Sequence, residues 1–126
     1  MSAEQNKAAI RRQLEAFETG DVSILEKLAD ELYAADYVLH DPDYPDLPRG
    51  PEGVKQFVRG ALQNMPGVHV TIEDMVAEGD RVATRFTVHG TNVSTGKPMR
   101  MLVMSISRFV GNKIAEEWQL GVPAQA

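Results

Sequence analysis

Residues 68–91, VHVTIEDMVAEGDRVATRFTVHGT, decide the fold expected of this chain. Apolar and polar side chains alternate along both halves of the stretch, which is typical of β-strands that lay one face on a protein core. The pair Gly79-Asp80 separates the halves and suits a two-residue hairpin turn, because glycine tolerates a positive φ. The stretch therefore predicts an antiparallel hairpin.

Two more alternating segments follow the hairpin. They are MRMLVMSISRFV at 99–110 and KIAEEWQLGV at 113–122, joined by the turn pair Gly111-Asn112. Alternation over this length, bounded by glycine and asparagine, again indicates strands. The C-terminal half is therefore predicted to be a meander of four antiparallel strands.

The first 67 residues contain three stretches with helical periodicity, and between the second and the third a short extended segment, ADYVLHD, and a proline-rich loop, DPDYPDLPRGP. Ser2 and Gln5 form a potential capping box at the start of a first helix, and Gly20 followed by Asp21 indicates a break before a second. Pro51 suits the first turn of a third helix. Helices followed by a strand meander predict an α+β fold.

Composition limits the classes of partner. The 126 residues fit a single domain spanning residues 1–126, and the formal net charge of -5 disfavours nucleic acid and anionic membranes. The sequence contains no cysteine, no signal-peptide pattern and no run long enough to span a bilayer. We expect a cytoplasmic protein with no nucleic-acid or membrane partner.

Counting outward from Gly79-Asp80 places Asp74 opposite Arg85 and Val70 opposite His89, all on one face of the hairpin. This face mixes ionisable and aliphatic residues, a pattern also found on the wall of a small-molecule pocket. Asp74 and Arg85 are equally compatible with a cross-strand ion pair that only stabilises the hairpin.

The same count around Gly111-Asn112 places Ser107 opposite Glu116 and Ser105 opposite Trp118. Glu116 and Trp118 then share a face, and a carboxylate among apolar groups has a raised pKa and can act as a base. The alternative is a structural glutamate bonded to Ser107 or an arginine.

Several segments together resemble the SnoaL-like polyketide cyclase family of the nuclear-transport-factor-two-like superfamily: VLHDP, AEGDRVATRFTVHGT, TGKPM and GNKIAEEW. The similarity extends over roughly residues 5–120. It implies a cone-shaped fold in which three N-terminal helices pack on a curved antiparallel sheet and enclose a pocket. It also implies ring closure of a carbonyl compound by acid/base chemistry with neither a metal nor an organic cofactor.

Family members commonly use a C-terminal aspartate, but this sequence has no aspartate after Asp80. Other ionisable residues must replace it if the protein is a cyclase or isomerase. The candidate catalytic residues are Glu116, Asp74 and His89. The candidate ligand-binding residues are Tyr37, His40, Arg85, Trp118 and Phe57.

Two other functions remain open. The pocket could hold a small hydrophobic ligand without catalysis, or side chains could fill it and leave assembly as the only role. His40 and the acidic residues after it match no metal-binding pattern. The segment from Met99 to Ile106 is apolar on both faces, so we expect helices on one side and a second copy on the other, giving a homodimer through the sheet.

Overall fold

The computed structural model describes residues 2–124, which form an α+β fold as predicted. In chain order the elements are α1 (Ala3–Glu15), the short 3-10 helix η1 (Ala16–Thr19), α2 (Val22–Leu32), β1 (Tyr33–His40), α3 (Pro51–Asn64), β2 (His69–Glu78), β3 (Arg81–Asn92), β4 (Lys97–Val110) and β5 (Lys113–Ala124). No helix among these residues is both long and apolar enough to cross a membrane.

The helix ends confirm the capping signals. The Ser2 hydroxyl accepts a hydrogen bond from the Gln5 amide at 3.1 Å, and the Gln5 side chain accepts one from the Ser2 amide at 2.9 Å. Gly20 adopts a left-handed φ of 63° between η1 and α2. Asp21 caps α2 by accepting a hydrogen bond from the Ser23 amide at 2.9 Å.

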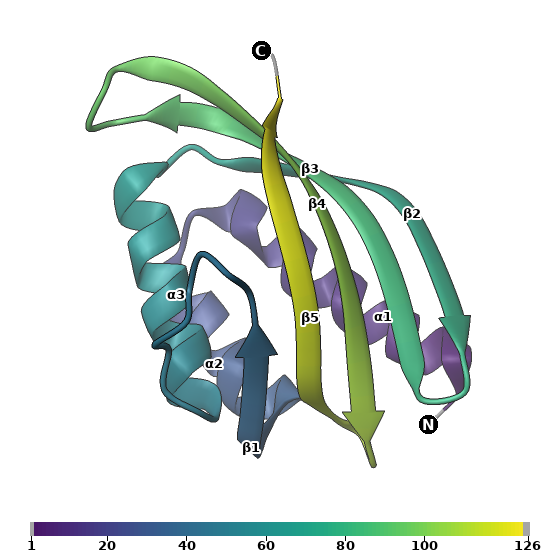
Figure 1. Ribbon diagram of the computed structural model, residues 1–126. Coiled ribbons are helices and arrows are strands. Elements are labelled where there is room, and N and C mark those ends of the chain that lie inside the picture. The colour runs from purple at the N-terminus through teal and green to yellow at the C-terminus, as the bar shows by residue number, and fades with distance from the viewer. Residues whose placement is uncertain (1, 125–126) are drawn as a thin grey trace.

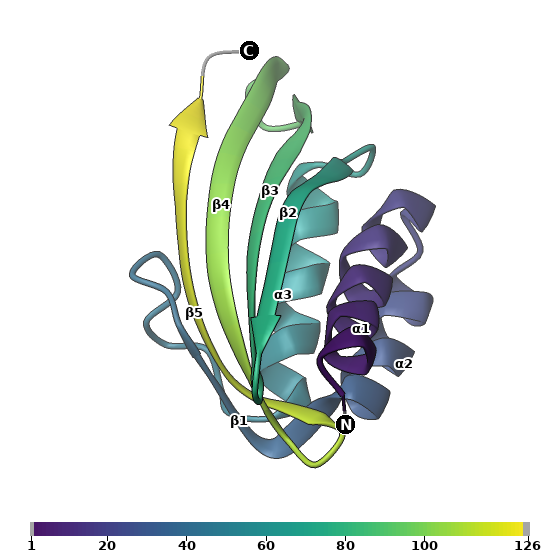
Figure 2. The same cartoon turned by 90° about the vertical axis from the view of Figure 1, so that its right-hand side faces the viewer.

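The strands form one sheet in the order β1-β5-β4-β3-β2. Strands β2 to β5 are the predicted antiparallel meander, and β1 lies parallel to β5 at the edge. The sheet curves, and the three α-helices cover its concave side (Figures 1 and 2). The fold is the expected cone of helices on a bent sheet.

Two β-bulges interrupt the counted pairing. The β2–β3 register shifts between Ile72 and Asp74, so Glu73 is an extra residue. In β5, Phe109 pairs with Ile114 as counted, but Arg108 pairs with Glu116, which leaves Ala115 extra. A bulge changes which face every residue beyond it presents.

The concave face forms the hydrophobic core together with the helices. Val82, Phe86, Val103, Phe109 and Ile114 point into it from three strands and are each less than a tenth exposed. Val82, Phe109 and Ile114 lie close to the β2–β3 and β4–β5 turns, whereas Phe86 and Val103 lie farther along the strands and also line the cavity described below. The end of the cone opposite these turns is where the sheet and helices diverge.

Candidate active site

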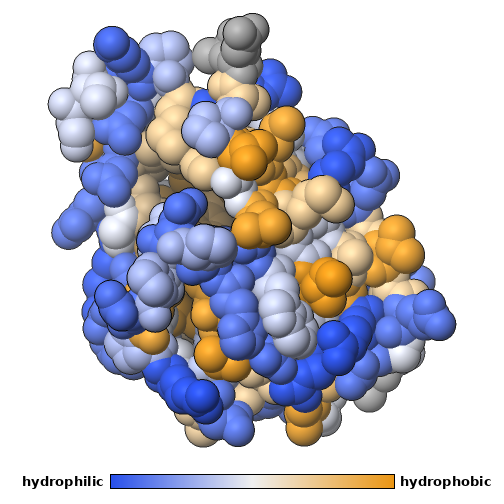
Figure 3. Space-filling view, in the orientation of Figure 1, coloured by the Kyte–Doolittle hydropathy of each residue, from blue (hydrophilic) through white to orange (hydrophobic). Residues whose placement is uncertain are grey.

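A cavity of about 240 Å³ lies between the concave face of the sheet and the helices. Its wall is mostly apolar and includes Leu14 and Phe17 from the first helical segments and Val88 and Met101 from the sheet. Figure 3 shows a hollow in the surface beside the loop that follows β1. A concave apolar cavity with a few polar groups is the usual form of a small-molecule site.

Glu117 is a carboxylate on the cavity wall. It comes from β5, and its oxygens accept hydrogen bonds from the Tyr37 hydroxyl at 2.8 Å and the Ser107 hydroxyl at 2.5 Å. Burial raises the pKa of Glu117 above its ordinary value, and the bonds from Ser107 and Tyr37 only partly oppose this effect. The site therefore holds a carboxyl group with increased basicity in an apolar environment.

Tyr37 fixes one oxygen of this carboxylate. Its ring is buried against Tyr33, with centroids 4.8 Å apart in an edge-to-face pair. Burial, and then the charge of Glu117, raise the pKa of Tyr37 well above its ordinary value. The phenol therefore keeps its proton and acts as a hydrogen-bond donor to Glu117.

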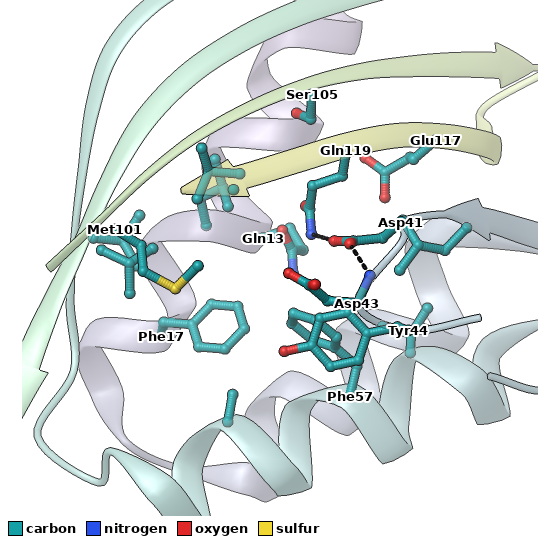
Figure 4. A pocket seen from close by; sticks show the side chains of 18 of the residues that line it. Gln13, Phe17, Asp41, Asp43, Tyr44, Phe57, Met101, Ser105, Glu117 and Gln119 are labelled. Carbon is teal, nitrogen blue, oxygen red and sulfur yellow. Dashed lines mark hydrogen bonds between the residues drawn. The ribbon is translucent and has the colours of Figure 1, made fainter. Parts of the chain in front are cut away.

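Asp41 and Gln119 form a second polar pair on the same wall. The Gln119 Nε2 donates to Asp41 Oδ2 at 2.9 Å, and the Asp43 amide donates to Asp41 Oδ1 at 2.9 Å (Figure 4). An ionised carboxylate only accepts hydrogen bonds, so Asp41 fixes the orientation of the Gln119 amide. This amide lies two residues from Glu117 on one strand.

The pKa of Glu117 predicts a pH-dependent difference in stability. The folded chain keeps the Glu117 proton above the ordinary pKa of 4.5, whereas the unfolded chain releases it. The unfolding free energy therefore falls as pH rises through the interval between the two values and is unaffected below it. In urea titrations, the unfolding free energy of Glu117→Gln relative to that of wild type should therefore increase progressively with pH over this interval. Parallel pH profiles would contradict the assignment.

The prediction that Glu116 lies on the pocket wall is wrong. The bulge at Ala115 directs Glu117 inward and Glu116 to the outer face. There Glu116 binds Arg108 Nη2 at 3.0 Å and lies 2.6 Å from His40 Nε2. Hydrogen bonds from His40, and then from Arg108, lower the pKa of Glu116 although partial burial raises it. This is the structural interpretation considered from sequence.

Trp118 and His40 also lie outside the cavity, contrary to prediction. Trp118 follows Glu117 and therefore faces outward, where it pairs with Ile106 in place of the expected Ser105. His40 stacks on it with ring centroids 5.5 Å apart, and the Arg81 guanidinium lies 5.2 Å from the indole centroid. These residues form an outer cluster behind the pocket wall.

Asp74, Arg85 and His89 share one face as counted, but it is the outer face. Arg85 Nη2 and Asp74 Oδ2 are 2.6 Å apart in an exposed cross-strand ion pair. The Glu73 bulge brings His69 opposite His89, where the prediction had placed Val70. The concave face must cover the core, so the more apolar face of this hairpin turned inward.

Tyr37 and Phe57 are the predicted ligand-binding residues that line the cavity. The residues missed are Glu117, Gln119, Asp41 and Asp43. The adjacent acids Glu116-Glu117 were a visible signal, because alternation places one of any two neighbours on each face. Among residues 2–124, no three His, Cys, Asp or Glu side chains are placed to hold a metal ion.

The sheet, helices and cavity define a protein of the nuclear-transport-factor-two-like fold. Residues 10–117 match the SnoaL-like domain, and the chain belongs to this family. No curated protein matches the sequence.

Similar solved structures carry related descriptions. IdmH of Streptomyces antibioticus, described as a candidate polyketide cyclase, is 30% identical over 93% of this chain and 91% of its own, with a TM-score of 0.78. A candidate cyclase of Acidithiobacillus ferrooxidans is 26% identical over 96% and 91%, with a TM-score of 0.78. AclR of Streptomyces galilaeus, described as a candidate hydroxylase, is 25% identical over 95% and 80%, with a TM-score of 0.78.

Proposed function

We propose that this protein is a cofactor-independent cyclase or isomerase that removes a proton from a carbon next to a carbonyl group of a small hydrophobic compound. The observation that carries the proposal is Glu117, a carboxylate in an apolar cavity whose pKa burial raises. A base is most effective when its pKa lies near the working pH, and burial moves a carboxylate in that direction.

Glu117 keeps the capacity to accept a proton. Each carboxylate oxygen has two acceptor positions, and Tyr37 and Ser107 use one on each oxygen. These two bonds hold the carboxylate in a fixed orientation and leave a lone pair on each oxygen. Preorganisation of this kind reduces the entropy lost in reaching the transition state.

Gln119 is placed to stabilise the developing enolate. One amide hydrogen is donated to Asp41, which leaves the second for a ligand oxygen. Alternate residues on a strand are about 7 Å apart, so a carbonyl oxygen and its neighbouring carbon fit between Gln119 and Glu117 with contacts of about 3 Å on each side. Asp41 is then a positioning residue for this donor.

The reaction begins with proton transfer from the substrate to Glu117. The carbon–hydrogen proton moves to a Glu117 oxygen, the released electron pair forms the carbon–carbon double bond of the enolate, and the carbonyl π electrons move to the oxygen that Gln119 contacts. The enolate carbon then attacks a second carbonyl of the same molecule, and the alkoxide formed there takes the proton from Glu117, which completes the ring closure. In a compound whose carbon–carbon double bond is conjugated with the enolate, the far carbon of that double bond takes the proton from Glu117 instead, which isomerises the compound. Both outcomes return the carboxylate.

A non-catalytic binding protein is the second candidate, because the protein's own Tyr37 and Ser107 hydroxyls already donate a hydrogen bond to each Glu117 oxygen. Deuterium exchange distinguishes the two functions. β-Tetralone in D₂O is followed by NMR with and without protein, and its binding is measured by calorimetry. Exchange above the buffer rate supports the enzyme, and saturable binding without added exchange supports the binding protein.

We also propose a homodimer through the outer face of the sheet. Leu102 opposes Val122 and Met104 opposes Leu120 on this face, and all four are exposed, Met104 and Leu120 each to 63%. Apolar side chains gather over this part of the sheet in Figure 3. An apolar patch on a sheet is a common site of association.

The substitution Met104→Glu tests the dimer. A charge buried in the interface without a partner should weaken association about a hundredfold or more. Sedimentation velocity should then show wild-type dimer and variant monomer. Val93→Glu, at an exposed position between β3 and β4, should leave the dimer intact. Wild-type protein that sediments as a monomer would refute this interface.

A further inference from the structure

The charge distribution of the cavity differs from that of the rest of the protein. Three carboxylates line it, Asp41, Asp43 and Glu117, whereas no lysine, arginine or histidine of residues 2–124 does so. Outside the cavity, ten acidic side chains pair with basic ones, as in Glu31 with Arg12 and Asp30 with Lys55, and five do not. The cavity therefore has negative charge without a basic counterpart on its wall.

Asp41 shows this imbalance most clearly. It is only 8% exposed, and its carboxylate accepts hydrogen bonds from the neutral Gln119 amide and the Asp43 backbone. Within the described chain no basic group lies within 4.0 Å of it. A buried carboxylate is normally paired, because removing its charge from water is costly. A cation entering the cavity would relieve this cost.

An aromatic pair lies beside these acids. Tyr44 and Phe57 meet edge to face with centroids 4.9 Å apart, and both line the cavity together with Asp41 and Asp43 (Figure 4). Burial raises the pKa of Tyr44, and the charges of Asp41 and then Asp43 raise it further, as expected for groups close together. Carboxylates next to aromatic rings favour an ammonium group through charge attraction and cation–π contact.

We propose that the ligand of this cavity is an amine-bearing hydrophobic compound, whose protonated nitrogen lies between Asp41 and Asp43 and against the Tyr44–Phe57 pair. The inference rests on the proposed function in one respect, namely that this ligand is also the carbonyl compound that meets Glu117. Anionic compounds of the same size are excluded by like-charge repulsion and by the absence of a basic group on the wall that would pair with them.

Three probes with one skeleton test the charge preference. Phenylbutylamine, phenylbutanol and phenylbutanoate are titrated into the wild-type protein at neutral pH by calorimetry. The amine should bind about tenfold tighter than the alcohol, and the carboxylate should bind most weakly. Equal affinities for the amine and the alcohol, or tighter binding of the carboxylate, would overturn the inference.

Matched variants show which acidic side chains cause the preference for the amine. Asp43→Asn should reduce the advantage of the amine over the alcohol about threefold or more. Asp46→Asn removes the same charge from the same loop outside the cavity wall and should leave the ratio unchanged. Asp41→Asn, which keeps an oxygen for the Asp43 amide, gives a second measurement. An amine preference that survives both Asp41→Asn and Asp43→Asn would refute this site.

Failure of this inference is distinguishable from failure of the proposed function. The three probes have no ketone, so their binding does not depend on proton transfer by Glu117. Protein-catalysed exchange of neutral β-tetralone without an amine preference would refute the ammonium site alone. An amine preference without catalysed exchange, including with an amine-bearing ketone, would refute the catalytic role and keep the ammonium site.

Discussion

Replacing Glu117 with glutamine is expected to slow proton exchange of a bound ketone about 10²–10⁴-fold, the usual contribution of a positioned general base. Glutamine keeps the size of the side chain and an oxygen for the Tyr37 hydroxyl, but its amide cannot accept the proton. Binding of the ketone should change little, because the substitution removes the base and leaves the apolar wall. NMR exchange rates and calorimetric affinities provide the two measurements.

Glu116→Gln is the matched control for this experiment. It makes the same chemical change one residue earlier on β5, where the side chain binds Arg108 and His40 on the outer face. The exchange rate should therefore stay near that of wild type. Equal losses in the two variants would indicate a general effect on β5, and loss only in Glu116→Gln would contradict the face assignment.

The substitution Gly53→Ala should destabilise the fold by about 3 kcal/mol. Gly53 is buried in the first turn of α3, and an added Cβ would lie 2.0 Å from the carbonyl oxygen of Pro48. The Pro48 carbonyl belongs to the backbone and a Cβ cannot rotate away from it, so the loop after β1 would have to move away from the helix. Because this loop carries Asp41 and Asp43, ligand binding should weaken as well.

Gly60→Ala in the same helix should have the opposite effect on stability. Apart from the adjacent turns of the helix itself, no atom lies within 4 Å of the Cβ that this substitution would add. Alanine in a helix interior is favoured over glycine by roughly 0.5–1 kcal/mol. Urea denaturation of the two variants gives the sign of each change, and a destabilised Gly60→Ala or a neutral Gly53→Ala would contradict the packing described for α3.

The sequence was sufficient to predict the elements because their signals are local. Ser2, Gln5 and Asp21 cap helices through contacts within three residues, and Gly79 and Gly111 mark turns between alternating segments. Each of these signals depends on neighbours along the chain. The position of β1 beside β5 could not be derived in this way, because it depends on contacts between segments about 80 residues apart.

The site was harder to predict, because the face of the sheet on which a side chain lies depends on the strand register. Counting from Gly111-Asn112 gave the correct partner for Ile114 and the wrong partners beyond Ala115. The prediction therefore placed Glu116 on the pocket wall, where the structure has Glu117. The prediction for the β2–β3 hairpin was wrong for a different reason. Asp74 and Arg85 were paired correctly, but the choice of inner face depended on which side the helices would cover.

The bulge at Ala115 has a consequence for comparing this chain with its relatives. Loss of Ala115 would leave Glu116 opposite Arg108 and Glu117 opposite Ser107, so a one-residue gap here preserves the pocket side chains. Loss of one residue between Glu117 and Gln119 would instead turn every later side chain of the strand to the opposite face of the sheet. In a relative without the bulge, matching residues backward from Trp118 would keep inward and outward side chains in step, whereas matching them forward from the preceding turn would pair residues of opposite faces.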